Sequence, residues 1–323
     1  MENKTWEDYF IAALSEIHPK STKLVQELMD LLNIGREAVY RRLRKDVTFP
    51  MYEILKIASS WHISLDAIAG INSGKIPFFM HPMSYVTPSK EDMDFVRKRV
   101  KALEQLKHVP YSEYMVVSNN ASRSITAGFD VIYKFNIFKW TYEYCSHCNE
   151  DSNMPYSQVI IPEELRKEIS VYYQRMKYVT ETSYVWDNMM IEHLINEVRF
   201  FHSILLVTDN EKKLIKKELH DLLDYLIEVV NTGCFPETKN KVRIYASILN
   251  INTNYSYFYN GKTEECRIHA FNMYDNITYN KEMIENFKEW IQKKKRTSVL
   301  ISEVDERSRI EFFTKQRKLI ESL

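Results

Sequence analysis

A short segment near the N-terminus concentrates positive charge. The whole chain of 323 residues is neutral, with 44 basic and 44 acidic side chains. Residues 36 to 45, however, hold five basic side chains and one acidic side chain: Arg36, Arg41, Arg42, Arg44, Lys45 and Glu37. Such a local excess of cations binds nucleic-acid phosphates, and Arg can also hydrogen-bond both acceptors of a guanine edge. The segment therefore indicates contact with DNA.

The spacing of apolar residues predicts that this segment is a helix beginning at Arg36. Val39 and Leu43 define its buried side. Glu37, Arg41, Arg44 and Lys45 face away from that side, and Tyr40 and Arg42 flank it. The exposed face of this helix is therefore expected to be basic.

Four further short helices are expected around it. Apolar residues recur at helical spacing over 5–18, 21–32 and 48–61, and Ser64 caps a short last helix. Asn33, Ile34 and Gly35 interrupt the pattern just before the basic helix, and Asn and Gly tolerate left-handed or extended backbone. Five short helices with a tight turn before the third are thus predicted within seventy residues.

The segment LMDLLNIGREAVYRRLRKDVTFPMYEILKIASSWHISLDAIAG resembles the helix-turn-helix domain of Cro- and lambda-repressor-like bacterial regulators. The resemblance covers about residues 5 to 70. It implies that the helix after the turn enters the major groove, with its first residues at base edges, while the preceding helix crosses the backbone. Many members have Gly at the position of Asn33 and Ser or Thr at the position of Gly35, so the turn departs from the family pattern.

By position, the resemblance makes Arg36, Glu37 and Arg41 the base-reading candidates. Their chemistry agrees, because Arg can bind guanine and Glu can accept from cytosine N4. Tyr40 could contact a phosphate or a thymine methyl group, and the phosphate-contacting candidates are Arg42, Arg44 and Lys45. The alternative is that this face is a solvated charged surface on a small helical bundle that contacts only proteins.

Two other groups of residues could carry chemistry. Cys145 and Cys148 have zinc-knuckle spacing with His147 between them, but no second such pair completes four ligands, so no metal or other cofactor is predicted. His193 and Glu197 lie one turn apart on an apolar stripe of an expected helix over 182–206 and should face the core. They form either a hydrogen-bonded structural pair or the polar part of an effector site.

The length of the chain predicts a multidomain protein. We expect an all-α helix-turn-helix domain over residues 1–70, a linker over 71–88 that contains several Pro residues, and an α+β region over 89–323 with antiparallel strands. The absence of a signal peptide or a long apolar run indicates a cytoplasmic protein without membrane contact and with reduced thiols.

Within 89–323 the pattern predicts helices over 89–107, 162–177, 182–206, 209–230, 280–294 and 305–320. Alternating apolar residues predict strands in KVRIYASILNI, YSYFYNG and ECRIHAFNMY, and TSVLISE is a further strand. Residues 112–144 are aromatic-rich with mixed periodicity, and their pattern fits either a strand or a buried helix.

These features predict a sequence-specific, double-stranded-DNA-binding transcriptional regulator that acts as a homodimer. Residues 89–323 would provide dimerisation and the response to an unknown small-molecule or protein effector. The first alternative is a regulatory protein-interaction protein that its helix-turn-helix localises. The second is a DNA-autoregulated enzyme, although the common nucleotide-binding, hydrolase and metalloprotease motifs are missing and no catalytic residue is predicted.

Overall fold

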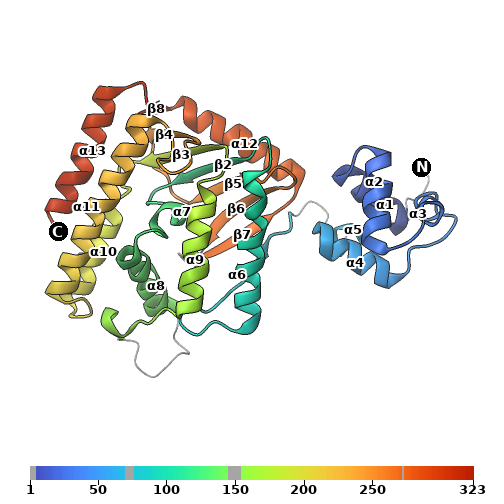
Figure 1. Cartoon of the computed structure of the whole chain (residues 1–323), viewed down its shortest axis with the longest axis horizontal. Coiled ribbons are helices and arrows are strands. Elements are labelled where there is room, and N and C mark those ends of the chain that lie inside the picture. The colour runs from blue at the N-terminus through green and yellow to red at the C-terminus, as the bar shows by residue number, and fades with distance from the viewer. Residues whose placement is uncertain (1–4, 70–75, 145–153, 271–272) are drawn as a thin grey trace. The chain divides into compact units, whose positions relative to one another are not determined.

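The computed structural model describes residues 5–69, 76–144, 154–270 and 273–323 (Figure 1). The chain divides into two compact units, Met1–Pro77 and Phe78–Leu323, which we call the first and the second unit. Each has its own hydrophobic core, and each is described by itself.

The described part of the first unit is built from short helices: α1 (Trp6–Ile17), α2 (Ser21–Leu32), α3 (Arg36–Leu43), α4 (Met51–Trp61) and α5 (Leu65–Ile68). Thr5 begins α1 with a capping box, since its hydroxyl accepts from the Asp8 N–H and the Asp8 carboxylate accepts from the Thr5 N–H. The core holds apolar residues from the first four helices, among them Leu14, Leu28, Val39 and Ile57, all fully buried.

The second unit contains one sheet of eight strands in the order β1-β7-β6-β5-β2-β3-β4-β8. The strands are β1 (Phe79–Met80), β2 (Glu113–Ser118), β3 (Glu181–Asp187), β4 (Lys241–Ser247), β5 (Tyr255–Tyr259), β6 (Glu264–Ala270), β7 (Tyr274–Thr278) and β8 (Ser298–Leu300). The central strands β2, β3 and β4 are parallel, and Tyr184 pairs with Val116 on one side and Ile244 on the other. The other neighbouring strands pair antiparallel.

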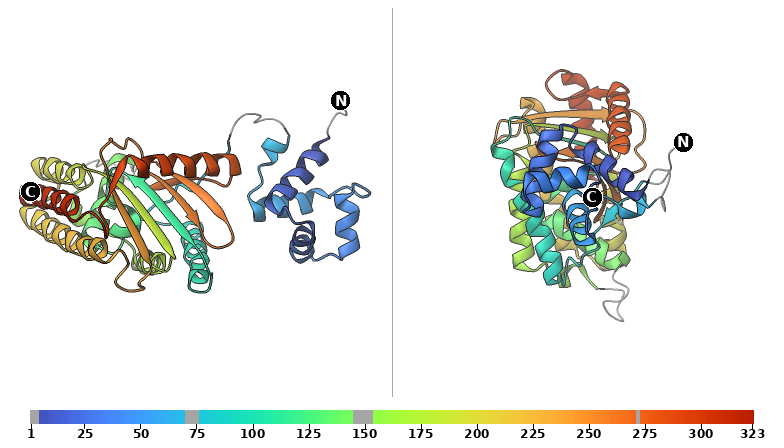
Figure 2. Two further views of the ribbon diagram at one scale, coloured as in Figure 1. Left: turned by 90° about the horizontal axis from the view of Figure 1, so that it is seen from above. Right: turned by 90° about the vertical axis from the view of Figure 1, so that its right-hand side faces the viewer.

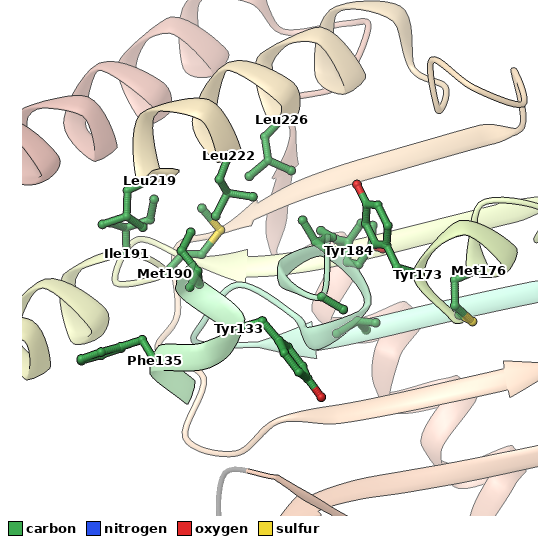
Figure 3. Close-up of a cluster of buried hydrophobic side chains, with 14 of the residues drawn as sticks. Tyr133, Phe135, Tyr173, Met176, Tyr184, Met190, Ile191, Leu219, Leu222 and Leu226 are labelled. Atoms are coloured by element: carbon green, nitrogen blue, oxygen red, sulfur yellow. The ribbon is translucent and has the colours of Figure 1, made fainter. Parts of the chain in front are cut away.

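Helices cover both faces of this sheet (Figures 1 and 2). The larger core lies under α6 (Lys90–Ala102), α7 (Arg123–Thr126), α8 (Asp130–Tyr144), α9 (Glu163–Met176), α10 (Glu192–Ser203), α11 (Asp209–Thr232) and α13 (Glu306–Glu321). Figure 3 shows part of this core, where Leu219, Leu222 and Leu226 of α11 line one side. The opposite face packs against α12 (Lys281–Arg296). Short 3-10 helices occupy Glu104–Lys107 and Tyr156–Gln158.

The α+β class predicted for this region is confirmed, but the strand directions are only partly antiparallel, because β4 is parallel to β3. The helix predicted over 182–206 is wrong: its first residues form β3 and only Glu192–Ser203 is helical. A central parallel strand is buried on both faces and shows no period-two alternation, so apolar periodicity does not distinguish it from a buried helix. The ambiguous segment 112–144 contains both, namely β2 and then α7 and α8.

The segment expected as a linker joins the second unit earlier than predicted. Among its described residues, Phe79–Met80 form the edge strand β1, and Met83 and Tyr85 are buried in the larger core. Proline excludes a helix from this stretch but allows extended chain, so composition alone does not separate a linker from a peripheral strand. In the part of the chain that the structure describes, no helix combines the length and the apolar character that crossing a bilayer requires.

Candidate functional site

The turn between α2 and α3 fixes which face of α3 reaches solvent. Asn33 ends α2 in the left-handed region at φ 55° and ψ 47°, which Asn adopts more readily than most residues. Gly35 then begins α3 with extended backbone. Because Val39 is fully buried in the first unit's core, the opposite side of α3 is exposed.

Arg36 and Arg41 lie on this exposed side, and among the described residues neither guanidinium forms an ion pair or a hydrogen bond. The Arg36 guanidinium lies 5.9 Å from the centre of the Tyr40 ring, which is half-buried. The two side chains therefore leave their N–H donors to solvent or to a ligand.

Arg42, unlike Arg36 and Arg41, is half-buried and points toward α4. Its guanidinium donates two hydrogen bonds to the Glu53 carboxylate of α4, Nε to Oε2 at 2.6 Å and Nη2 to Oε1 at 2.8 Å, and a third to the Ala38 carbonyl at 3.1 Å. The Glu53 side chain is 1% exposed. A buried carboxylate requires such a partner, so Arg42 joins α3 to α4. The sequence had made Arg42 a phosphate-contacting candidate, but in the structure its guanidinium is occupied by Glu53.

The remaining cations form exposed pairs. Arg44 lies 3.1 Å from Glu37 and 3.1 Å from Asp46, and Lys45 lies 2.6 Å from Asp8. The hydrogen bond from Lys45 lowers the pKa of Asp8 to about 2. Exposed pairs of this kind are weak, so Arg44 and Lys45 can exchange their carboxylate partners for phosphate. Glu37, a predicted base reader, is held by Arg44.

The structure brings His193 and Glu197 together on α10 but not in the core. His193 is exposed, and the residues of α10 that are buried are Ile195, Val198 and Phe201. The prediction that the pair faces the core is wrong, because the helix starts only at Glu192, after β3, so the apolar stripe assumed for a longer helix does not exist. Both residues instead line an open pocket of about 630 Å³.

A buried lysine lies in the wall of this open pocket. The Lys139 ammonium of α8 donates to the Glu197 carboxylate at 2.5 Å, and the Lys139 side chain is 9% exposed. Three asparagines, Asn119, Asn252 and Asn254, also line the pocket. The contact with Lys139 identifies Glu197 as the partner of a buried cation.

The second unit has another cavity that the sequence did not predict, lined by residues of the sheet and of helices α6, α7, α8 and α9. Its volume is about 110 Å³. Three arginines line it, Arg99 from α6, Arg123 at the start of α7 and Arg267 from β6, together with Asp275 from β7 and His269 from β6. We call it the arginine cavity.

Asp275 is the central acceptor of the arginine cavity. Its Oδ1 accepts from Nη2 of Arg123 and lies 2.7 Å from Nδ1 of His269, and the same Nη2 lies 3.1 Å from that ring nitrogen. Burial would raise the pKa of Asp275, but Arg123 and His269 outweigh it and hold that pKa well below its usual range. Burial also lowers the pKa of His269, against the opposing effect of Asp275. The site therefore holds an ionised Asp275 and a neutral His269 at pH 7.

The three arginines differ in their partners. Arg123 also donates to the Met273 carbonyl, and Arg267 donates to Glu265, with Nε at 2.6 Å from Oε1. Arg99 makes no hydrogen bond among the described residues, and its closest carboxylate oxygen is Asp275 Oδ2 at 3.8 Å. Arg99 is thus the arginine of the cavity with free donors.

One sequence signal for the arginine cavity exists, in β6. Glu265, Arg267 and His269 alternate on one face of that strand, and His269 pairs with Asp275 of β7 in register. Charged residues on one face of a strand next to the core must find partners there. Arg99 and Arg123 come from segments far away in the sequence, and only the fold brings them to this place.

The predicted cysteine site lies outside the described residues, which exclude Cys145 and Cys148. Within the described ranges no group of three or more His, Cys, Asp or Glu residues could hold a metal ion. Cys234 and Cys266 are free, and burial raises the pKa of the Cys266 thiol to about 12, so it stays protonated at neutral pH.

A comparison of the chain with protein-family models, curated proteins and solved structures found no match.

Proposed function

We propose that this protein is a sequence-specific DNA-binding transcriptional regulator whose first unit binds double-stranded DNA in the manner of Cro- and lambda-repressor-like helix-turn-helix proteins. The observation that carries the proposal is the exposed side of α3, where Arg36 and Arg41 have no acidic partner among the described residues. In this arrangement α3 enters the major groove and α2 crosses the backbone.

The contacts divide the exposed cations into two roles. Arg36 and Arg41 have free guanidinium groups and are the base readers, because a guanidinium can bind guanine O6 and N7 together. Arg44 and Lys45 exchange exposed carboxylates for phosphates and raise affinity without reading sequence. When Arg44 binds a phosphate instead of Glu37, the Glu37 carboxylate becomes available to accept a hydrogen bond from cytosine. Tyr40 adds a phosphate or thymine-methyl contact.

The proposal includes a homodimer, because strong operators usually engage two half-sites and a single small module buries too little surface. The second unit supplies the dimer contact and the response to an effector, and DNA as the ligand implies a cytoplasmic protein. Sedimentation of the full chain at micromolar concentration tests the dimer, and a monomer would contradict it.

The DNA experiment starts by selecting fragments from a random duplex library with the full chain. We expect an enriched motif that the double substitution Arg36→Ala with Arg41→Ala loses. Arg307→Ala is the control, since it removes one exposed cation from the second unit, where its contact is to Glu311. No enrichment by the unsubstituted protein, or an unchanged motif after the double substitution, would refute the proposal.

A second candidate, protein docking by the first unit, is favoured by three exposed apolar side chains on α4. Met51, Tyr52 and Leu55 are 66%, 68% and 52% exposed. Leu55→Glu tests this candidate. A dimer that dissociates on this substitution would place the contact between copies in the first unit, whereas the proposal above expects no change in sedimentation.

A further inference from the structure

We propose that the arginine cavity binds a small organic monocarboxylate, with the carboxylate on Arg99 and the apolar body against side chains such as Phe95, Val96 and Ile169. These residues line one cavity together with Arg99. The binding step belongs to the second unit and does not depend on DNA binding by the first.

The pairing of charges leaves one cation for a ligand. Asp275 is hydrogen-bonded to Arg123 and Glu265 to Arg267, whereas Arg99 lies 3.8 Å from Asp275, beyond hydrogen-bond distance. The remaining nearby carboxylate, Asp92, accepts from the Ser89 N–H and from His81 at 2.8 Å. Arg99 alone lacks a hydrogen-bonded anion among the described residues, and a bound anion would supply one.

The position of Arg99 allows a ligand to reach it. Its side chain is 23% exposed, and its guanidinium lies 5.6 Å from the centre of the Phe95 ring one turn earlier in α6. A cation–π contact of this kind holds the guanidinium near the ring without using its N–H donors. A planar carboxylate can accept two parallel hydrogen bonds from those donors.

A second unpartnered donor lines the same cavity. Tyr133 is 6% exposed, and its hydroxyl makes no hydrogen bond among the described residues. Figure 3 shows the Tyr133 ring extending away from Leu219 and Leu222. Burial raises the pKa of Tyr133 far above neutrality, so the hydroxyl keeps its proton and can donate to a ligand oxygen.

The size and charge of the cavity select the ligand class. A volume of about 110 Å³ is below the roughly 300 to 1,000 Å³ of drug-sized pockets and near the roughly 150 Å³ of an engineered cavity that binds benzene. A phosphate dianion would bring two charges toward one free arginine and would face the ionised Asp275 in the same wall. A small apolar molecule with one negative charge fits both the volume of the cavity and the charge of Arg99.

The test is calorimetric titration of the full chain with isobutyrate and benzoate, and with benzamide and inorganic phosphate for comparison. We expect saturable binding of at least one carboxylate and affinity at least about tenfold lower for benzamide, because the amide lacks the charge that a guanidinium bond uses. Failure of both carboxylates to bind, or equal binding of benzamide, or binding of phosphate alone, overturns the proposal.

Substitutions assign the binding to this cavity. Arg99→Gln should lower carboxylate affinity about tenfold or more, Arg99→Lys by less, and Tyr133→Phe should also weaken binding while leaving the ring in place. Arg97→Gln is the matched control, since Arg97 lies on the same helix, is 43% exposed and pairs with Glu164 outside the cavity. If a folded Arg99→Gln protein bound the carboxylate with unchanged affinity, the carboxylate would bind at another site, and the assignment to this cavity would be overturned.

Discussion

The arginines of the two units have opposite surroundings. On α3 of the first unit, Arg36 and Arg41 reach solvent with no acidic partner in the described chain. In the arginine cavity of the second unit, Arg123 and Arg267 are held by Asp275 and Glu265 between helices and sheet. An exposed cation can leave water for phosphate at little cost, whereas a buried cation is stable only with its partner. The first arrangement suits binding of a large polyanion, and the second suits a small fixed site.

The sharpest way to break this comparison is to remove the carboxylate at the centre of the cavity. Asp275→Ala should lower the free energy of unfolding of the second unit by about 3 to 5 kcal/mol, because it leaves Arg123 without its anion. Chemical denaturation followed by circular dichroism measures the loss. Asp224→Ala, which removes an exposed partner of Arg317, should cost about 1 kcal/mol or less. Equal losses would mean that the cavity charges are as weakly coupled as surface charges.

The next effect concerns Arg42, the α3 arginine that is paired with a buried carboxylate as the cavity arginines are. Arg42→Ala should destabilise the first unit by about 3 kcal/mol, since Glu53 would lose its two hydrogen bonds from the guanidinium. Thermal unfolding measures this, and Arg41→Ala is the control because Arg41 is exposed and has no ion-pair partner among the described residues. If Arg42→Ala left stability intact and weakened DNA binding instead, Arg42 would be a phosphate contact after all.

A third substitution separates base reading from phosphate contact on the exposed face. Arg41→Ala should cost roughly 1 to 3 kcal/mol on a selected operator and much less on scrambled DNA. Lys45→Ala should weaken both DNAs alike and reduce the salt slope by about one. Binding measured on both DNAs at several salt concentrations distinguishes them. Equal losses on both DNAs for Arg41→Ala would exclude it as a base reader.

The neutral histidine of the cavity predicts a pH effect on stability. Burial holds the pKa of His269 below 6.5, so the unfolded chain binds this proton more tightly than the folded protein. The second unit should therefore be destabilised as the pH falls below about 6.5, by at most about 1.4 kcal/mol per pH unit from this group. His269→Gln should flatten that slope in unfolding experiments at pH 7 and pH 5. A slope that survives the substitution would come from other groups.

The same contrast explains what the sequence could predict. The cations in and just after α3 lie within ten residues of one another, so their density was visible without a structure, as was the α+β class. The cavity was not visible, because Arg99, Arg123 and Asp275 are brought together by long-range packing. His193 and Glu197 failed as core residues because β3 looks like part of a helix when only apolar periodicity is considered. The pairing of Arg42 was not visible either, because its partner Glu53 is one helix away.

The smallest expected effect concerns Gly35 at the start of α3. Its φ of −69° and ψ of 156° suit any residue, and a Cβ there would meet no atom within 4 Å. Gly35 gives α3 no side-chain cap, so Gly35→Ser should add a hydroxyl that accepts from the Ala38 N–H. The gain should be about 0.5 kcal/mol, which raises the melting temperature of a unit of this size by about 2 to 4 °C.

Two controls define what a stabilising Gly35→Ser would mean. Gly35→Ala adds the Cβ without the cap, so it should gain less if the hydroxyl acts as proposed. Gly233→Ser should destabilise, because Gly233 has φ +64° and a Cβ would collide with Glu303. A stabilised Gly35→Ser protein that binds DNA as before would show that the turn into α3 has room for the cap that the resembling family carries. A stabilised protein that has lost DNA binding would mean that the backbone at Gly35 approaches the DNA too closely for a side chain, and this would place the DNA against the N-terminus of α3.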